Sequence, residues 1–258
     1  MTVALLGAGE IGRGWAALFA AFGADVRIVD PDPRAVEHAR RSLAIARELG
    51  VGAGDAGRIA AADARAAVRD AAWVQESLPE SLDVKRAMLE EIAGALPRDC
   101  IVASSTSTLV ASDLAAGLPF AERLLVAHPL HPVYAVPVVE LSAGRDTAPA
   151  TVERAAVVLR ALGREPVIVH GEPPGLIANR LCGAMLREAE ALVASGAATR
   201  EEVDRIVAHG TGTGWLIAGP FRTEAIGRGG GGMSERDWAR AIAAVLRAAH
   251  GTGELGTV

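Results

Sequence analysis

The 258-residue chain contains little of several residue types, and each scarcity excludes a class of protein. Its only two cysteines, Cys100 and Cys182, lie in apolar segments, which gives neither a disulfide framework nor a zinc-binding pattern and fits a reducing compartment. No apolar run reaches the length of a transmembrane helix, and the N-terminal run lacks the basic residues of a signal peptide. We therefore expect a cytoplasmic protein that crosses no membrane and binds no metal.

Positive charge is also scarce, because 26 Lys and Arg residues face 31 Asp and Glu residues, for a formal net charge of −5. A mildly acidic surface disfavours nucleic acids and anionic membranes as partners. Hydrophobic residues make up 50% of the chain, which excludes a disordered protein. The length suits one medium domain and one small domain.

Short apolar runs alternate with amphipathic stretches up to residue 172, and a purely helical pattern follows. The expected strands are 2–6, 25–29, 73–76, 100–103, 123–127, 136–141 and 166–169. The expected helices are 11–22, 34–49, 81–96, 109–116, 148–162, 176–195, 200–209 and 233–249, with a glycine-rich turn region at 210–219. The pattern predicts an α/β domain with a mostly parallel sheet at residues 1–172 and a small all-helical domain at 173–258.

A glycine-rich turn follows the first expected strand and opens the first expected helix. Gly7 permits the tight turn, Gly9 lets the backbone approach a pyrophosphate, and Gly12 lets the helix pack closely on the strand. Asp30 ends the second expected strand, where its carboxylate can accept hydrogen bonds from ribose hydroxyls and repel a 2′-phosphate. The motif predicts a Rossmann-type domain that binds NAD. Arg34 leaves NADP open, and an FAD site or a purely structural turn are the remaining alternatives.

A cluster of hydroxyl side chains at residues 104–108 follows the expected strand 100–103. In an open α/β sheet this end of a strand lies beside the cofactor crevice, so Ser107 is a candidate substrate ligand. The same cluster suits a helix cap, in which Ser107 or Thr108 accepts hydrogen bonds from the next helix. Spacing alone leaves the two interpretations equal.

His128 ends another expected strand, and Glu140 lies on the strand that follows. Oxidation of an alcohol needs a base for the hydroxyl proton, and an imidazole suits that task near neutral pH. Glu140 can hold the second ring nitrogen and stabilise the charged ring. The alternative is a loop histidine with an unrelated surface acid, and spacing alone does not decide between them.

Three further polar residues stand near the expected crevice. Asn179 falls in the first turns of the helix 176–195, where it can bond a substrate oxygen, although spacing alone favours an ordinary polar residue on a helix face. Glu80 and Lys85 begin the helix 81–96. They either reach the nicotinamide ribose or form a surface ion pair.

Taken together, these residues resemble the 3-hydroxyacyl-CoA dehydrogenase superfamily, and within it the branch of L-gulonate 3-dehydrogenase (lambda-crystallin) and carnitine dehydrogenase. The resemblance covers roughly residues 1–220 and is carried by the collinear segments GAGEIGRGWAALFA, VQESLPESLDVK, SSTSTLVASDLAAGL, AHPLHPVYAVPVVEL and GLIANRL. It implies a Rossmann domain followed by a helical domain that closes the active site and usually dimerises.

The resemblance also implies roles for single residues. His128 is similar to the family's base, Glu140 to its partner, and Ser107 and Asn179 to the ligands of the substrate oxygen. The positions that resemble NAD contacts are Asp30, Glu80, Lys85 and the turn backbone at Glu10-Ile11.

The chain departs from the family pattern in three places. The motif His-x-x-Asn-Pro is replaced by one with His131 in the place of the amide. The arm at residues 34–70, where the CoA enzymes carry lysines, has none, which favours a free hydroxy acid. Relatives continue into a longer helical tail, whereas this chain has the glycine run 229–232 and ends at Val258.

We expect an NAD-dependent oxidoreductase that converts a 3-hydroxy acid to the 3-keto acid, or the reverse, with a small hydroxy acid as its partner. A 3-hydroxyacyl-CoA or carrier-bound hydroxyacyl dehydrogenase is the first alternative. A non-catalytic NAD(H)-binding protein, similar to a crystallin, is the second. The apolar face at residues 176–193 predicts a homodimer through residues 175–258.

Overall fold

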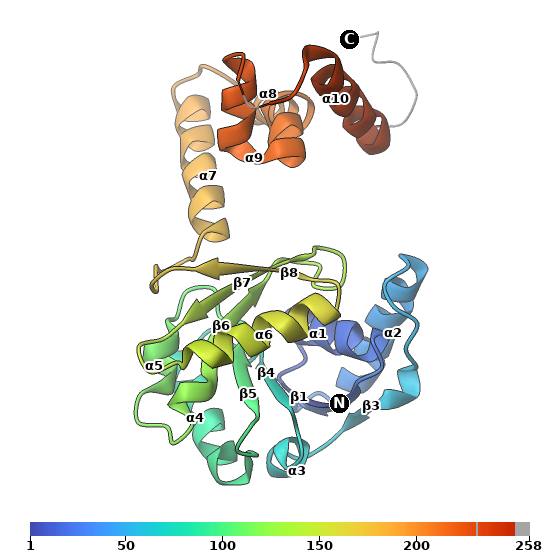
Figure 1. Cartoon of the computed structure of the whole chain (residues 1–258), viewed down its shortest axis with the longest axis vertical. Helices are drawn as coiled ribbons and strands as arrows, with labels where there is room; N and C mark the ends of the chain where they lie inside the picture. The colour runs from blue at the N-terminus through green and yellow to red at the C-terminus, as the bar shows by residue number, and fades with distance from the viewer. Residues whose placement is uncertain (231, 251–258) are drawn as a thin grey trace. The chain divides into compact units, whose positions relative to one another are not determined.

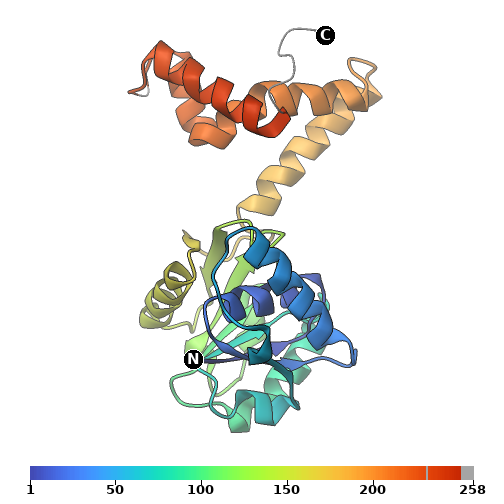
Figure 2. The same cartoon turned by 90° about the vertical axis from the view of Figure 1, so that its right-hand side faces the viewer.

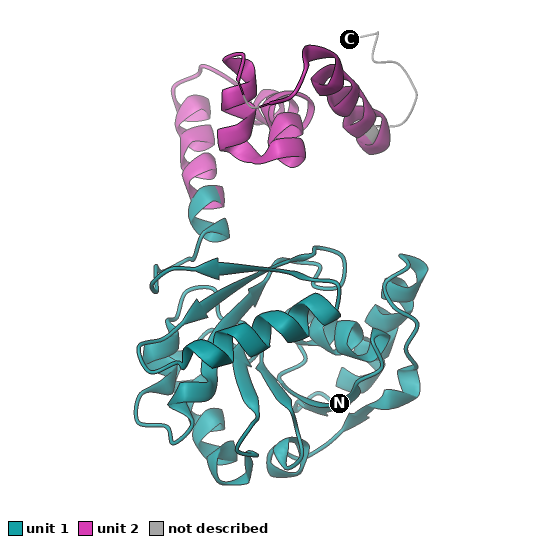
Figure 3. Ribbon diagram, in the orientation of Figure 1, with its two compact units in different colours: residues 1–181 teal, residues 182–258 magenta. Residues whose placement is uncertain are grey.

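The computed structural model describes residues 1–230 and 232–250. It divides the chain into two compact units, Met1–Leu181 and Cys182–Val258 (Figure 3). Gly231 of the glycine run and the C-terminal residues 251–258 lie outside the described residues. The predicted fold class is confirmed, because the first unit is an α/β structure with a mostly parallel sheet and the second is built of helices.

The first unit is built on one eight-stranded sheet with the strand order β3-β2-β1-β4-β5-β6-β7-β8 (Figure 1). All neighbouring strands pair in parallel except β6 and β7. The strands are β1 (Thr2–Leu6), β2 (Asp25–Val29), β3 (Ile59–Ala61), β4 (Trp73–Glu76), β5 (Ile101–Ser104), β6 (Leu124–Pro129), β7 (Val138–Ala143) and β8 (Glu165–Val169). From β1, the strands β2 and β3 are added on one side and β4 and the later strands on the other, and this change of side creates a crevice at the carboxyl ends of β1 and β4.

Helices cover both faces of this sheet. Successive strand residues point to opposite faces, so Val3 and Leu5 pack with one set of helices, and Ala4 and Leu6 with the other. The first set is α1 (Glu10–Ala21), α2 (Ala35–Glu48) and α6 (Pro149–Ala161). The second set is α3 (Ala64–Val68), α4 (Leu82–Ile92) and α5 (Ala111–Ala115). Helices α1 and α2 lie side by side in both views (Figure 1, Figure 2).

The edge strand β3 has no counterpart among the expected elements. It has three residues, of which Ile59 is buried while the two alanines are exposed, so it carries no alternating pattern. Its pairing with β2, at Val26 opposite Ile59, is a long-range contact that a local pattern does not contain. A strand this short is therefore defined by its pairing with β2 and could not be predicted from the local sequence.

The second unit contains most of α7 (Ala178–Ala194), then α8 (Arg200–Ile206), a π-helical turn (Val207–Thr211), α9 (Gly212–Gly227) and α10 (Glu235–His250). The predicted turn region at 210–219 is wrong, because this stretch is helical. One of its glycines, Gly214, serves close packing, since a Cβ there would lie 2.8 Å from Thr223 Cγ2. The chain bends only at Gly219, with φ of 73° before Pro220. Within the described residues, no helix is both long and apolar enough to span a bilayer.

Candidate active site

The glycine turn has the shape that a dinucleotide pyrophosphate requires. Gly7 has a φ of 89°, and a Cβ on Gly12 would lie 2.0 Å from the carbonyl oxygen of Gly7, so neither position accepts a side chain. A Cβ on Gly9 would meet no atom within 4 Å, which leaves an open side where α1 begins. The turn therefore fits NAD at the N-terminus of α1, beside the backbone of Glu10 and Ile11.

Asp30 lies at the end of β2, beside this turn. Its Oδ2 accepts a hydrogen bond of 2.6 Å from the N–H of Ala8, and its Oδ1 accepts one of 2.8 Å from the N–H of Asp32. Arg34, which left NADP open, has its Nε 3.3 Å from Asp32 Oδ1 and is exposed. Asp30 thus both shapes the turn and stands where an adenosine ribose is expected.

The hydroxyl cluster at residues 104–108 contains a single hydroxyl that is left for a ligand. Ser107 is half-buried, and its hydroxyl forms no hydrogen bond with any described residue. The other four hydroxyls are bonded within the protein: Ser104 to Glu76, Ser105 to Gln75, Thr106 to Glu80 and Thr108 to Glu80. The structure thus distinguishes Ser107 from its neighbours, which spacing did not do.

The helix-cap interpretation of this cluster is wrong. Helix α5 begins at Ala111, later than expected, and the residue before it, Val110, makes no side-chain cap. The N–H of Leu109 is instead bonded by the hydroxyl of Thr106, at 2.9 Å. Neither Ser107 nor Thr108 caps the helix, because the residue directly before its first turn is Val110, whose backbone is extended.

His128 of β6 and Glu140 of β7 form a buried pair. They face each other directly in the antiparallel pairing of β6 with β7. The distance from His128 Nδ1 to Glu140 Oε2 is 2.8 Å, and the residues are 7% and 2% exposed. The alternative of a loop histidine with a surface acid is therefore wrong. Because Nδ1 is held by the carboxylate, Nε2 is the ring nitrogen left for a substrate.

The second carboxylate oxygen of Glu140 binds the start of α7. Its Oε1 accepts hydrogen bonds from the N–H of Ile177 at 2.7 Å and of Ala178 at 3.0 Å. Asn179 is the next residue along the chain. One carboxylate thus orients the imidazole and anchors the backbone that presents Asn179.

The candidate residues converge on a pocket of about 310 Å³ within the first unit. His128, Ser107 and Asn179 line it together with the helix residue Ile11. His131 lies at the same pocket with its side chain 50% exposed, and its Nε2 is 3.5 Å from Glu10 Oε1. The remaining lining residues are Ser105, Pro129 and Leu130.

Glu80 and Lys85 do not form the surface pair that was the alternative for them. Lys85 is 1% exposed, and its Nζ lies 2.8 Å from Glu76 Oε1 and 3.4 Å from Glu80 Oε2. Glu80 accepts hydrogen bonds from the backbone N–H groups of Ser107 at 3.1 Å and Thr108 at 3.0 Å. This network fixes the loop that carries Ser107.

The pKa of Glu80 reflects that position. Burial raises the pKa of its carboxyl, but hydrogen bonds from Thr106 and Thr108 and the charge of Lys85 outweigh burial and lower it to about 2. The carboxylate is therefore charged across the physiological range and holds its donors firmly.

Glu76 and Gln75, both fully buried at the end of β4, were not among the residues predicted from the sequence. Glu76 neutralises Lys85 and accepts the hydroxyl of Ser104, and Gln75 bonds Ser105. A charged residue inside a short buried strand was the signal that could have identified Glu76, because a buried carboxylate requires a partner.

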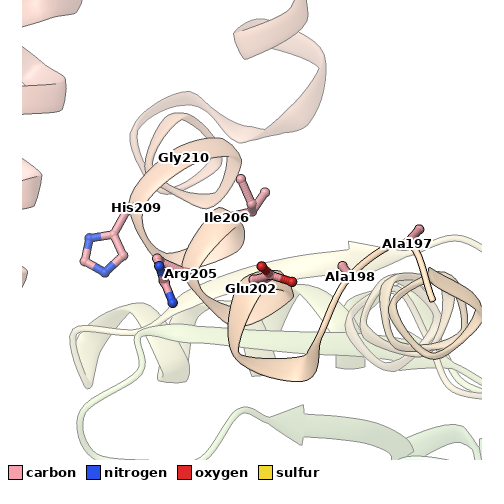
Figure 4. Close-up of a pocket in the computed structure, with 7 residues that line it drawn as sticks. All are labelled: Ala197, Ala198, Glu202, Arg205, Ile206, His209 and Gly210. Atoms are coloured by element: carbon pink, nitrogen blue, oxygen red, sulfur yellow. The ribbon is translucent and has the colours of Figure 1, made fainter. Parts of the chain in front are cut away.

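A second, larger pocket of about 550 Å³ lies in the helical unit (Figure 4). It is lined by Ala197, Ala198, Glu202, Arg205, Ile206, His209 and Gly210. None of the candidate catalytic residues belongs to it. Among the described residues, no group of three or more His, Cys, Asp or Glu side chains is arranged to hold a metal ion.

Two family models match the chain. The model "3-hydroxyacyl-CoA dehydrogenase, NAD binding domain" matches residues 2–172, and the model "3-hydroxyacyl-CoA dehydrogenase, C-terminal domain" matches residues 175–252. The chain is 42% identical over 238 residues to an L-carnitine dehydrogenase of Streptomyces griseus subsp. griseus, covering 90% of this chain and 71% of that protein.

Solved structures show the same likeness. A 5-formyl-3-hydroxy-2-methylpyridine 4-carboxylic acid 5-dehydrogenase, described as an NAD⁺-dependent dismutase, has a TM-score of 0.81 at 32% identity, over 96% of this chain and 80% of that one. A 3-hydroxyacyl-CoA dehydrogenase of Archaeoglobus fulgidus has a TM-score of 0.74 at 28% identity, over 98% and 82%.

Proposed function

Because the chain belongs to the 3-hydroxyacyl-CoA dehydrogenase family and is an NAD-dependent dehydrogenase acting on CH–OH donors, we propose that its substrate is a free 3-hydroxy acid. The product is the 3-keto acid, and the reverse reaction uses the same groups. The observation that carries the proposal is the buried His128–Glu140 pair at 2.8 Å, beside a pocket that also contains Ser107 and Asn179.

In this proposal His128 is the base. Its Nε2 removes the hydroxyl proton of the substrate, while Glu140 holds the proton on Nδ1 and stabilises the resulting imidazolium. Bound NAD supplies the acceptor for the hydride that leaves the carbinol carbon. The free hydroxyl of Ser107 and the amide of Asn179 bond the oxygen as it becomes a carbonyl.

The residues around α2 favour a free acid over a CoA thioester. The arm at 34–70 has no lysine, and several of its arginines are already bound within the protein. Arg40 donates to the carbonyl groups of Ala56 and Ile59, and Arg41 pairs with Glu37. The guanidinium of Arg40 is therefore already occupied by backbone acceptors and is poorly placed for a CoA phosphate. We therefore propose L-carnitine, the 3-hydroxy acid in the names of the curated relatives, as the first substrate to test.

The likeness to the Archaeoglobus enzyme keeps a hydroxyacyl-CoA as the second candidate. The direct test is NADH formation at alkaline pH with L-carnitine, L-gulonate, 3-hydroxybutyrate and 3-hydroxybutyryl-CoA. Turnover of a free acid well above that of the thioester is expected. Preference for the thioester would overturn the substrate proposal, and tight NADH binding without any turnover would favour a non-catalytic binding protein.

We also propose a homodimer through residues 175–258. No described residue of α7 is buried, although the helix contains Met185, Leu186 and Leu192. Leu216 and Phe221 of α9 are 74% and 87% exposed. Apolar side chains at this exposure are typical of a surface that a second copy covers.

A further inference from the structure

Ser77 directly follows β4 and faces the glycine turn at the end of β1. Its backbone N–H donates to the carbonyl oxygen of Leu6 at 2.7 Å. A Cβ on Gly7 would lie 2.7 Å from the carbonyl oxygen of Ser77, and a Cβ on Gly12 would lie 3.3 Å from the Cβ of Ser77. The sheet order reverses between β1 and β4, so Ser77 stands at the point where such sheets bind their ligand.

A directed chain of hydrogen bonds ends at Ser77. The indole N–H of Trp73 donates to Gln75 Oε1 at 2.9 Å, which fixes the orientation of the amide. The amide nitrogen of Gln75 then donates to Ser105 Oγ at 2.8 Å. The indole N–H of Trp15 donates to the same oxygen at 3.1 Å. Both lone pairs of the Ser105 hydroxyl are therefore used.

The hydrogen of the Ser105 hydroxyl has one remaining acceptor, Ser77 Oγ at 2.8 Å. Ser77 thus receives a hydrogen bond, and its own hydrogen has no acceptor among the described residues. An exposed hydroxyl would donate this hydrogen to water. The hydroxyl of Ser77 is half-buried, so a hydrogen bond to a bound ligand would stabilise the complex. The chain presents one oriented O–H group beside the turn.

We propose that Ser77 is a cofactor-binding residue that donates this hydrogen to an oxygen of the bound dinucleotide, on its pyrophosphate or its nicotinamide-side ribose. The inference rests on NAD binding by this family and does not depend on which hydroxy acid is oxidised. The two tryptophans, Gln75 and Ser105 fix which lone pair of Ser77 is already used. The hydroxyl of Ser77 is therefore oriented before the cofactor binds.

The test is calorimetric binding to the full-length chain, with Ser77→Ala and the similarly sized Ser77→Cys, whose thiol is a weak donor. The ligands are NADH, ADP-ribose, ADP and AMP. We expect both variants to bind NADH and ADP-ribose roughly tenfold more weakly, the effect of losing one hydrogen bond to a strong acceptor, and to bind AMP unchanged. Weaker ADP binding assigns the acceptor to the pyrophosphate, and unchanged ADP binding assigns it to the ribose.

The matched control is Ser195→Ala, an exposed serine in the helical unit, which should bind all four ligands as the wild type does. Unchanged NADH affinity in both Ser77 variants would overturn the inference. An equal loss for AMP would also overturn it, because it would indicate a general collapse of the turn. A wild-type chain that binds no NADH would refute the cofactor assignment itself, and absent turnover with normal NADH binding would refute only the substrate proposal.

Discussion

At the scale of single residues, the site depends on which polar atoms are already used. Five neighbouring residues carry hydroxyls at positions 104–108, yet only Ser107 keeps its hydroxyl for a ligand. Glu80 accepts the hydroxyls of Thr106 and Thr108, on either side of Ser107, and the backbone N–H of Ser107 itself. A residue expected to contact the cofactor is thus also a positioning residue for the substrate loop.

Glu80 gives a pH-dependent prediction. Its folded-state pKa of about 2 lies below its ordinary value of 4.5, so its contribution to stability is complete above 4.5 and is lost as the pH falls through about 2. The difference in unfolding free energy between wild type and Glu80→Gln should be constant above pH 5 and should shrink at lower pH. Denaturant unfolding at several pH values measures it. A difference independent of pH would contradict the ionised role of Glu80.

His131 is the residue that departs from the family motif, and we expect it to contribute little to the chemistry. Its contact with Glu10, at 3.5 Å, joins two exposed side chains, and such pairs contribute about 0–1 kcal/mol. His131→Asn should therefore keep kcat within about fivefold of wild type. Steady-state kinetics on the best substrate provide the measurement. A loss as large as that of a His128 variant would make His131 a competing base.

At the scale of elements, the first turn of α7 is joined to β7 through Glu140. The carboxylate accepts three hydrogen bonds, from His128, Ile177 and Ala178. An amide cannot accept all of them, because its nitrogen only donates. The base and the segment carrying Asn179 therefore depend on the same side chain.

Glu140→Ala should lower kcat and also loosen the start of α7, because it removes both acceptor oxygens. We expect an unfolding free energy lower by about 1–3 kcal/mol, the cost of leaving a buried donor unpaired. Hydrogen exchange at the amides of Ile177 and Ala178 should become faster. Glu153→Ala, on the exposed face of α6, is the matched control and should change neither quantity. Unchanged protection of the two amides in Glu140→Ala would contradict the anchoring role.

Much of the element order was predictable because each parallel strand is a short apolar run that ends in a glycine or polar turn. The prediction was wrong where one sequence pattern is compatible with two local structures. Glycines at 210–214 indicated a turn, but they lie inside helices, where Gly214 lets Thr223 approach closely. Ser107 could not be separated from its neighbours, since their hydrogen-bond partners come from β4 and from the loop before α4, far away in the sequence.

At the scale of the whole molecule, the two units differ in how they bury their apolar residues. The α/β unit has a core on each face of its sheet, with Trp15, Phe19 and Trp73 fully buried. In the helical unit, the described large apolar side chains remain partly or mostly exposed. This contrast is the physical basis of the proposed homodimer.

Light scattering at micromolar concentration should give twice the chain mass of 26.5 kDa. Phe221→Asp should shift the protein toward the monomer, because it places a charge in an apolar contact. Val157→Ser, at an exposed apolar position on α6, should leave the dimer intact. A wild-type monomer would refute the proposal.

The central claim is that His128, held by Glu140, is the base of an NAD-dependent hydroxy acid dehydrogenase. The most direct measurement combines kcat of His128→Gln on the best substrate with its NADH dissociation constant. We expect a kcat lower by a factor on the order of a thousand, the typical contribution of a general base, with NADH affinity nearly unchanged. Near-normal turnover in His128→Gln would contradict the claim.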